Sequence, residues 1–129
     1  MKQHLNTIAT FILLLALAGC QSSDSDNDMP ATGAITEQIK LDGRSYLLAL
    51  PQNYQSDNSY KLLLAFHPSG GDSKGMQSLS QFEKLSNDYI VAYPKSEQVE
   101  WNEGCKCNIA HRLGADDLGF TSDMITDIQ

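Results

Sequence analysis

Residues 61–71, KLLLAFHPSGG, set the architecture of this chain. Residues 62–66 are apolar at every position, which is typical of a strand covered on both faces, as in a parallel sheet. A second stretch of the same kind, DYIVAYP at residues 88–94, follows after a segment long enough for one helix. Two buried strands joined by a helix predict parallel neighbours with a right-handed crossover.

The segment between these strands has helical periodicity. Apolar side chains recur there at three-residue intervals, at Met76, Leu79, Phe82 and Leu85. This spacing predicts a helix over residues 73–87 with one broad apolar face. We expect that face to lie in the core.

The flanking segments add a hairpin and a second helix. Residues 35–41 and 46–50 have the character of strands, and the Asp42-Gly43 pair between them suits a tight primed turn. We expect a long loop over 95–114 and then a helix to the end of the chain. The predicted fold is α/β: a β-hairpin followed by βαβα, with a mostly parallel sheet.

The N-terminus has the pattern of an export signal. Lys2 and His4 precede a mostly apolar run at residues 8–18. That run is shorter than the ~20 residues that a helix needs to span a bilayer. A short apolar run that ends in small residues predicts a signal peptide over residues 1–19.

The end of this signal resembles the lipobox of bacterial lipoproteins. Residues 17–20 read Leu-Ala-Gly-Cys, a pattern in which cleavage precedes the cysteine and acyl chains are attached to it. We expect an exported protein anchored through a lipid on Cys20, and Gln21 favours the outer membrane, with the domain periplasmic or surface-exposed. Residues 20–34 are polar and acidic, and we expect a disordered tether there.

The charge of the chain excludes some partners. Nine Lys and Arg against sixteen Asp and Glu give a formal net charge of −7. A nucleic-acid-binding surface needs clustered basic residues, so we expect no nucleic-acid partner. The same charge opposes adsorption to anionic lipid, so membrane attachment would depend on acyl chains.

The Gly-rich turn after the first buried strand is the candidate site. Ligands of open α/β sheets bind beyond the carboxyl ends of the strands. Backbone N–H groups in such a turn can converge on a developing negative oxygen, as in an oxyanion hole. The candidate oxyanion loop consists of His67, Pro68, Ser69, Gly70 and Gly71.

Five features in order resemble the opening of secreted esterases related to polyhydroxybutyrate depolymerases and feruloyl esterases. They are YLLALP at 46–51 with KLLLAFH at 61–67, Gly70-Gly71, Tyr93-Pro94, Trp101-Asn102-x-Gly104 with nearby cysteines, and Asp116-Asp117-Leu-Gly-Phe120. The resemblance covers residues 35–129. It implies an α/β-hydrolase-like fold and a Ser-Asp-His triad that cleaves hydroxyalkanoate polymers or hydroxycinnamate esters.

The resemblance places the triad outside this sequence. In the family the nucleophile lies in a Gly-x-Ser-x-Gly elbow after the next strand. We expect this chain to lack that motif and therefore to be an N-terminal fragment truncated before that strand, without nucleophile, acid or base, and inactive alone. The last helix stops without a Gly or Asn cap, which fits such a fragment. The family usually has Gly where this chain has Pro68, and proline removes one backbone donor, leaving that of Ser69.

Two loop residues have a plainer interpretation beside the catalytic one. His67 could be a general base, but the family pattern has a structural histidine before the turn. Ser69 lacks the elbow context of a nucleophile. Neither is expected to be catalytic.

Two further pairs have two interpretations each. Asp116 and Asp117 could form an acid–base couple, but adjacent helical residues do not face each other, which favours capping and solvation. Trp101 and Asn102 either line the substrate cleft or pack the long loop.

The cysteines near the long loop leave several arrangements open. Cys105, Cys107 and His111 have the spacing C-x-C-x₃-H, which is no standard zinc arrangement, and we expect no metal and no cofactor. A disulfide between Cys105 and Cys107 would close a small, strained ring. The resemblance implies instead that one of them pairs with a cysteine beyond Gln129.

Two functions are consistent with these observations. The leading hypothesis is a serine esterase that acts on a polyester or a hydroxycinnamoyl polysaccharide, represented here by its first part. The alternative is a non-catalytic surface lipoprotein that binds a polymer or protein partner. The sequence does not indicate an oligomeric state.

Overall fold

A computed structural model describes residues 35–129 of the chain. The predicted signal peptide, the acylated Cys20 and the tether lie outside the described residues. The elements in chain order are β1 (Ile35–Leu41), β2 (Arg44–Leu50), β3 (Lys61–Leu64), α1 (Ser73–Ser80), the 3₁₀ helix η1 (Phe82–Lys84), β4 (Tyr89–Pro94), α2 (Ile109–Arg112) and α3 (Asp117–Ile128). Within this range, no helix has both the length and the apolar character needed to cross a membrane.

The four strands form one mixed sheet in the order β1-β2-β4-β3. β3 and β4 are parallel, with Leu63 opposite Val91, which confirms the predicted parallel neighbours. β2 pairs antiparallel with both β1 and β4, so the expectation of a mostly parallel sheet is wrong. The physical reason is that the hairpin joins the sheet through β2, which places a reversed strand beside β4. The α/β class is correct.

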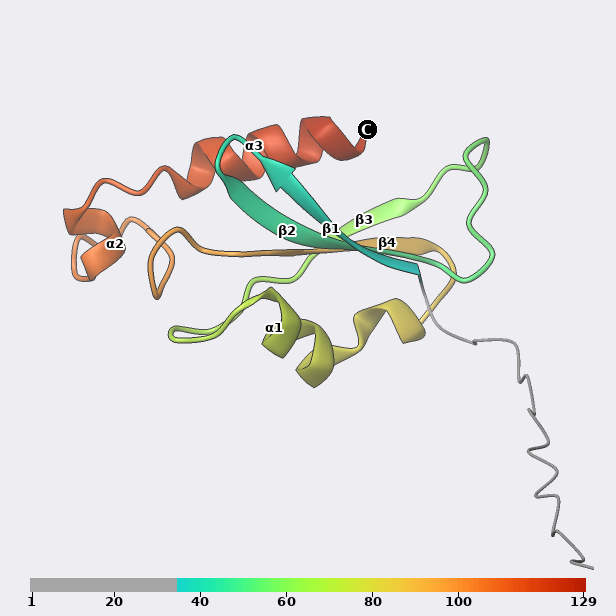
Figure 1. The fold of residues 1–129 in the computed structure, drawn as a ribbon, viewed down its shortest axis with the longest axis horizontal. Coiled ribbons are helices and arrows are strands. Elements are labelled where there is room, and N and C mark those ends of the chain that lie inside the picture. Colours follow the sequence, from blue (N-terminus) through green and yellow to red (C-terminus); the bar gives the residue numbers. More distant parts are fainter. Residues whose placement is uncertain (1–34) are drawn as a thin grey trace, which may run out of the picture.

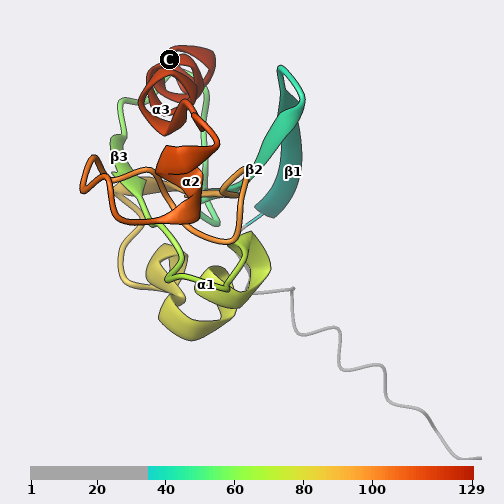
Figure 2. The same ribbon diagram turned by 90° about the vertical axis from the view of Figure 1, so that its left-hand side faces the viewer.

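Helices cover both faces of this sheet, α1 on one side and α3 on the other (Figures 1 and 2). Alternate residues of the strands enter the two resulting cores. The core on the α1 side contains Leu47, Ala49, Ala65, Val91 and Tyr93. The core on the α3 side contains Tyr46, Ala92, Phe120 and Met124. Coverage on both faces explains the uninterrupted apolar stretches in the sequence.

The predicted hairpin turn is confirmed. Asp42 and Gly43 connect β1 to β2 with φ angles of 47° and 82°. Two consecutive positive φ values are the conformation of a primed turn, whose twist matches that of the strands it joins. This turn places Arg44 at the start of β2, where it reaches the site described below.

The predicted helix over 73–87 is interrupted. α1 ends at Ser80 because Gln81 adopts a left-handed conformation with φ 46°, and η1 follows. The break removes the single apolar face that the spacing implied. Leu79 and Leu85 are 77% and 74% exposed, so their predicted place in the core is wrong. Met76 and Phe82 pack against the α1-side core as expected.

Candidate functional site

The candidate oxyanion loop connects β3 to α1, beyond the carboxyl end of β3. Figure 1 shows it at the same end of the sheet as the connection that runs from β4 through α2 to α3. The loop over 95–114 that we predicted contains the short helix α2. Hydrogen bonds between these two connections hold the candidate site together.

Residues 68–71 form a turn with one uncommitted donor. The N–H of Gly71 donates to the oxygen of Pro68 (2.9 Å), and Gly70 has φ 78°, as a type II turn requires at its third residue. The N–H of Gly70 donates to Val99 O (2.6 Å). Among residues 35–129, the N–H of Ser69 has no acceptor. The exposed turn thus offers one backbone donor to a ligand.

His67 is buried beneath this turn and supports it. Its Nδ1–H donates to Pro68 O (2.8 Å), and its Nε2 accepts from the N–H of Ser96 (3.2 Å). Because a carbonyl can only accept and a backbone N–H can only donate, these partners define which nitrogen carries the proton. Both ring nitrogens are occupied, which favours the structural role over that of a general base.

Trp101 joins the long loop to the candidate oxyanion loop. Its indole N–H donates to the carbonyl oxygen of His67 (2.9 Å). Its ring meets Phe66 edge-on with 4.9 Å between centroids. The half-buried indole therefore borders the loop and braces it at the same time.

Asn102 has its polar groups occupied by the protein. Its backbone N–H donates to Asp117 Oδ2 (2.6 Å), and its side-chain amide donates to Ala115 O (2.8 Å). Its Oδ1 lies 3.3 Å from Nδ1 of His111. These contacts favour the packing role of Asn102; the cleft role of Trp101 and Asn102 stays a prediction.

The adjacent aspartates have different roles. Asp116 accepts from the N–H of Gly119 (2.8 Å) as the N-cap of α3, as predicted. Asp117 is buried and paired with Arg44 (2.6 Å), with the two side chains 7% and 13% exposed. The expectation that Asp117 is solvated is therefore wrong, because Arg44 supplies its counter-charge.

Arg44 is the site residue that sequence reasoning missed. Its guanidinium lies 3.9 Å from the ring centroid of Phe120, and one of its nitrogens donates to Lys95 O (3.1 Å). Its Nε has no hydrogen-bond partner in the part of the chain that the structure describes. Nothing in the local sequence marks an arginine after a hairpin turn as the partner of an aspartate far along the chain.

Residues 71–75 read Gly-Asp-Ser-Lys-Gly, so the expectation that the chain lacks the letters of Gly-x-Ser-x-Gly is wrong. The geometry is not that of a nucleophile elbow, which exposes its serine on a sharp strand-to-helix turn. Ser73 is the first residue of α1 and is 7% exposed. Its Oγ has no hydrogen-bond partner within residues 35–129, so no base activates it.

Cys105 and Cys107 form a disulfide with each other. This differs from the expected pairing outside the sequence, and the left-handed Lys106 (φ 59°) provides the tight turn that lets the two side chains meet. Glu103 lies beside the two cysteines. Bonded sulfurs are not thiolate ligands, so this cluster does not form a metal site.

The sequence of this chain is similar to that of a known esterase. Ninety-four residues of the chain align at 30% identity with feruloyl esterase D of Neurospora crassa, which covers 67% of this chain and 31% of that protein. The chain thus spans about a third of the length of the curated relative that it matches. No family model matches the chain.

Proposed function

We propose, from this distant relationship to an esterase, that the chain carries the oxyanion-binding part of an α/β-hydrolase-like carboxylic-ester hydrolase. The feruloyl-esterase type, with hydroxycinnamate esters as substrates, is favoured by the relative; polyhydroxyalkanoates are the second substrate class. One observation carries the proposal: an exposed turn, in which the N–H of Ser69 has no acceptor within residues 35–129, follows a strand that is parallel to its neighbour.

The chemistry follows from that donor. Acyl transfer builds negative charge on the carbonyl oxygen of the ester, and a preorganised N–H at ~2.7–3.1 Å stabilises it. In α/β-hydrolases one such donor comes from the loop between the third strand and the following helix. The loop at 67–71 has that position. The proposal assigns this chain the donor and not the nucleophile, because no serine hydroxyl within residues 35–129 is hydrogen-bonded to a histidine.

A chimera tests the proposal directly. The aligned residues of this chain replace the corresponding segment of the N. crassa feruloyl esterase, which supplies the remaining catalytic groups, and hydrolysis of methyl ferulate is measured. Ser69→Pro removes the free N–H, while the second residue of a type II turn accepts proline readily. We expect it to lower kcat by about 10²–10³-fold.

Ser69→Ala is the matched control, because it keeps the N–H and removes only the hydroxyl. Chimeras with Ser69→Pro and Ser69→Ala that hydrolyse the ester equally fast would refute the proposed donor. Circular dichroism of both chimeras shows whether they are folded.

The unmodified chain provides a second measurement. Its single tryptophan, Trp101, lies beside the loop, and ferulate absorbs where tryptophan emits. We expect saturable quenching by methyl ferulate but no turnover of p-nitrophenyl acetate. Turnover by the chain alone would contradict the assignment of the nucleophile elsewhere. Ferulate binding together with an inactive chimera would favour the alternative, a non-catalytic surface protein.

We also propose that the protein is an exported lipoprotein held on a membrane by acyl chains on Cys20. The lipobox-like residues 17–20 support this. In a bacterial host we expect radioactive palmitate to label the chain and the chain to sediment with membranes. Cys20→Ser should lose both properties, and a Cys20→Ser protein that still takes up palmitate would refute the proposal.

A further inference from the structure

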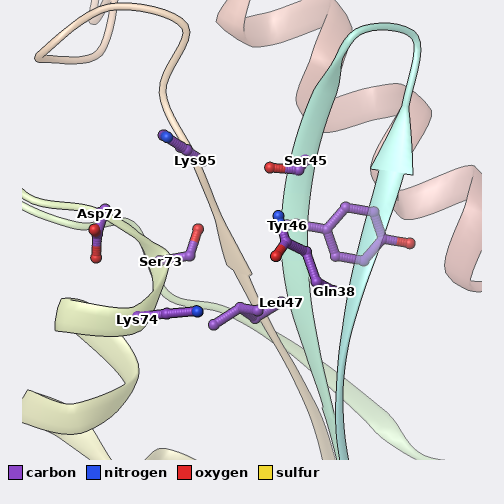
Figure 3. A pocket seen from close by; sticks show the side chains of 8 residues that line it. All are labelled: Gln38, Ser45, Tyr46, Leu47, Asp72, Ser73, Lys74 and Lys95. Atoms are coloured by element: carbon purple, nitrogen blue, oxygen red, sulfur yellow. The ribbon is translucent and has the colours of Figure 1, made fainter.

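A pocket of about 260 Å³ lies next to the candidate oxyanion loop, between the start of α1, β2 and the residue after β4 (Figure 3). Asp72 and Ser73 in its wall directly follow Gly71 in the chain. The residues that line it are mostly polar or charged: Gln38, Ser45, Tyr46, Leu47, Asp72, Ser73, Lys74 and Lys95.

The net charge of the side chains around this pocket has the opposite sign to the net charge of the chain. Lys74 and Lys95 are the cations, and Asp72 is the anion. The Asp72 carboxylate already accepts from the N–H of Gly75 (2.7 Å) as the N-cap of α1. The pocket therefore has one formal positive charge in excess, on a chain whose formal net charge is −7.

The start of α1 adds donors to the same place. α1 has eight residues, and the N–H groups of its first turn have no acceptor within the helix. The cap takes the N–H of Gly75, which leaves those of Ser73 and Lys74. The positive end of the helix dipole also favours an anion here.

Ser73 is the second, independent sign of a ligand. The residue is 7% exposed, yet its hydroxyl has no hydrogen-bond partner in the described part of the chain. Figure 3 shows this hydroxyl directed away from the helix, to the side on which Lys95 and Ser45 lie. A buried polar group without a partner is costly, and a ligand oxygen would satisfy it.

We propose that this pocket binds a carboxylate, and that the ester substrate of the proposed hydrolase carries that carboxylate beside the bond to be cleaved. The substrate part of this inference rests on the proposed function. A single excess positive charge matches a monoanion rather than a doubly charged phosphate or sulfate. Hydroxyl, amide and backbone donors around two lysines suit the two oxygens of one carboxylate.

Amide NMR of the full chain tests the proposal without requiring hydrolysis. The chain is titrated with sodium D-glucuronate at constant ionic strength, with D-glucose as the neutral counterpart. We expect saturable shifts at the amides of Ser73 and Lys74 with glucuronate and none with glucose. Equal shifts with glucose, or no saturation with glucuronate, would overturn the carboxylate site. Tighter binding of sulfate than of glucuronate would also overturn it.

Substitutions distinguish binding in the pocket from attraction by the general surface charge. Lys74→Gln and Lys95→Gln should each raise the Kd for glucuronate by about fivefold, the effect of one partly exposed ion pair. Lys61→Gln, at the start of β3, removes an exposed charge outside the pocket and should leave the Kd unchanged. Equal loss of affinity in all three variants would refute the pocket.

Ser73→Ala distinguishes ligand binding from folding. It should weaken glucuronate binding about threefold without lowering the free energy of unfolding, because it removes a buried hydroxyl that has no partner. A Ser73→Ala chain that binds normally would refute the assignment of its hydroxyl. A chain that binds glucuronate while the Ser69→Pro chimera stays fully active would separate the two proposals: the pocket would stand and the oxyanion donor would fall.

Discussion

The indole N–H of Trp101 donates to the carbonyl oxygen of His67 across a distance of 2.9 Å. This bond connects the long loop after β4 with the first residue of the candidate oxyanion loop. The ring of His67 in turn donates to the carbonyl oxygen of Pro68. Trp101 therefore restrains the turn indirectly, through His67.

Replacing Trp101 with Phe should lower the free energy of unfolding by about 2–3 kcal/mol, because a hydrogen bond and part of a packed aromatic surface are lost. Replacement with β-(3-benzothienyl)alanine keeps the shape and should lose only about 1 kcal/mol for the hydrogen bond. Urea denaturation followed by circular dichroism measures both. Val99→Ala, at a residue 61% exposed, is the control and should stay within about 0.5 kcal/mol of the parent.

The adjacent aspartates offer a matched pair of substitutions. Asp117→Asn leaves Arg44 buried without its counter-charge and should cost about 3–5 kcal/mol of the free energy of unfolding. Asparagine caps a helix as well as aspartate does, so Asp116→Asn should change the free energy of unfolding by less than about 0.5 kcal/mol. Thermal or urea unfolding of the two variants compares them. Equal losses of stability in the two variants would show that the Arg44–Asp117 pair contributes no more to stability than the N-cap does.

The raised pKa of Tyr93 leads us to predict that the protein loses stability at alkaline pH. Burial, and then its hydrogen bond to Glu83, raise the pKa of Tyr93 to about 12. The unfolded chain loses this proton near pH ~10, so between about pH 10 and 12 the folded state holds more protons. The free energy of unfolding should therefore fall as the pH rises through this window.

Tyr93→Phe should make that fall shallower, measured by urea unfolding at each pH. Tyr46 contributes in the same direction, because burial and then its bond to Asp127 raise its pKa above the usual range. Tyr54→Phe, at an exposed tyrosine, is the control and should keep the parent slope. A Tyr93→Phe chain with the parent slope would contradict the prediction.

Burial predicts opposite outcomes for one apolar residue of α3 and one of the interrupted helix α1. Met124 is fully buried, and Met124→Ala should cost about 2–5 kcal/mol of the free energy of unfolding. Leu79 is 77% exposed, and Leu79→Ala should change it by less than about 0.5 kcal/mol. Chemical denaturation measures both. A large loss for Leu79→Ala would mean that α1 continues as the sequence periodicity implied.

Local signals predicted the features that depend on neighbours in the sequence. The Asp42-Gly43 turn and the cap at Asp116 each follow from residues close together in the chain. The parallel pair of β3 and β4 follows from two apolar runs that one helical segment joins. Apolar runs report burial on both faces, which is why the class of the fold could be predicted. They do not report strand direction, and the reversed β2 beside β4 was missed for that reason.

The parts that were missed depend on distant contacts or on a single backbone angle. Gln81 ends α1 with one left-handed residue, and no composition signal marks it. The Arg44–Asp117 pair joins residues far apart in the chain. The disulfide between Cys105 and Cys107 depends on the conformation of Lys106, which spacing alone does not reveal.

The alternation of side chains along β4 limits how the length of this chain can vary. Val91 and Tyr93 belong to the core on the α1 side, and Ala92 between them belongs to the core on the α3 side. One inserted residue in β4 would send the later side chains of that strand into the opposite layer and disrupt both cores together. Residues 52–59 are exposed throughout and could absorb the same insertion. Insertions and deletions among natural variants should therefore accumulate in that loop and avoid β4.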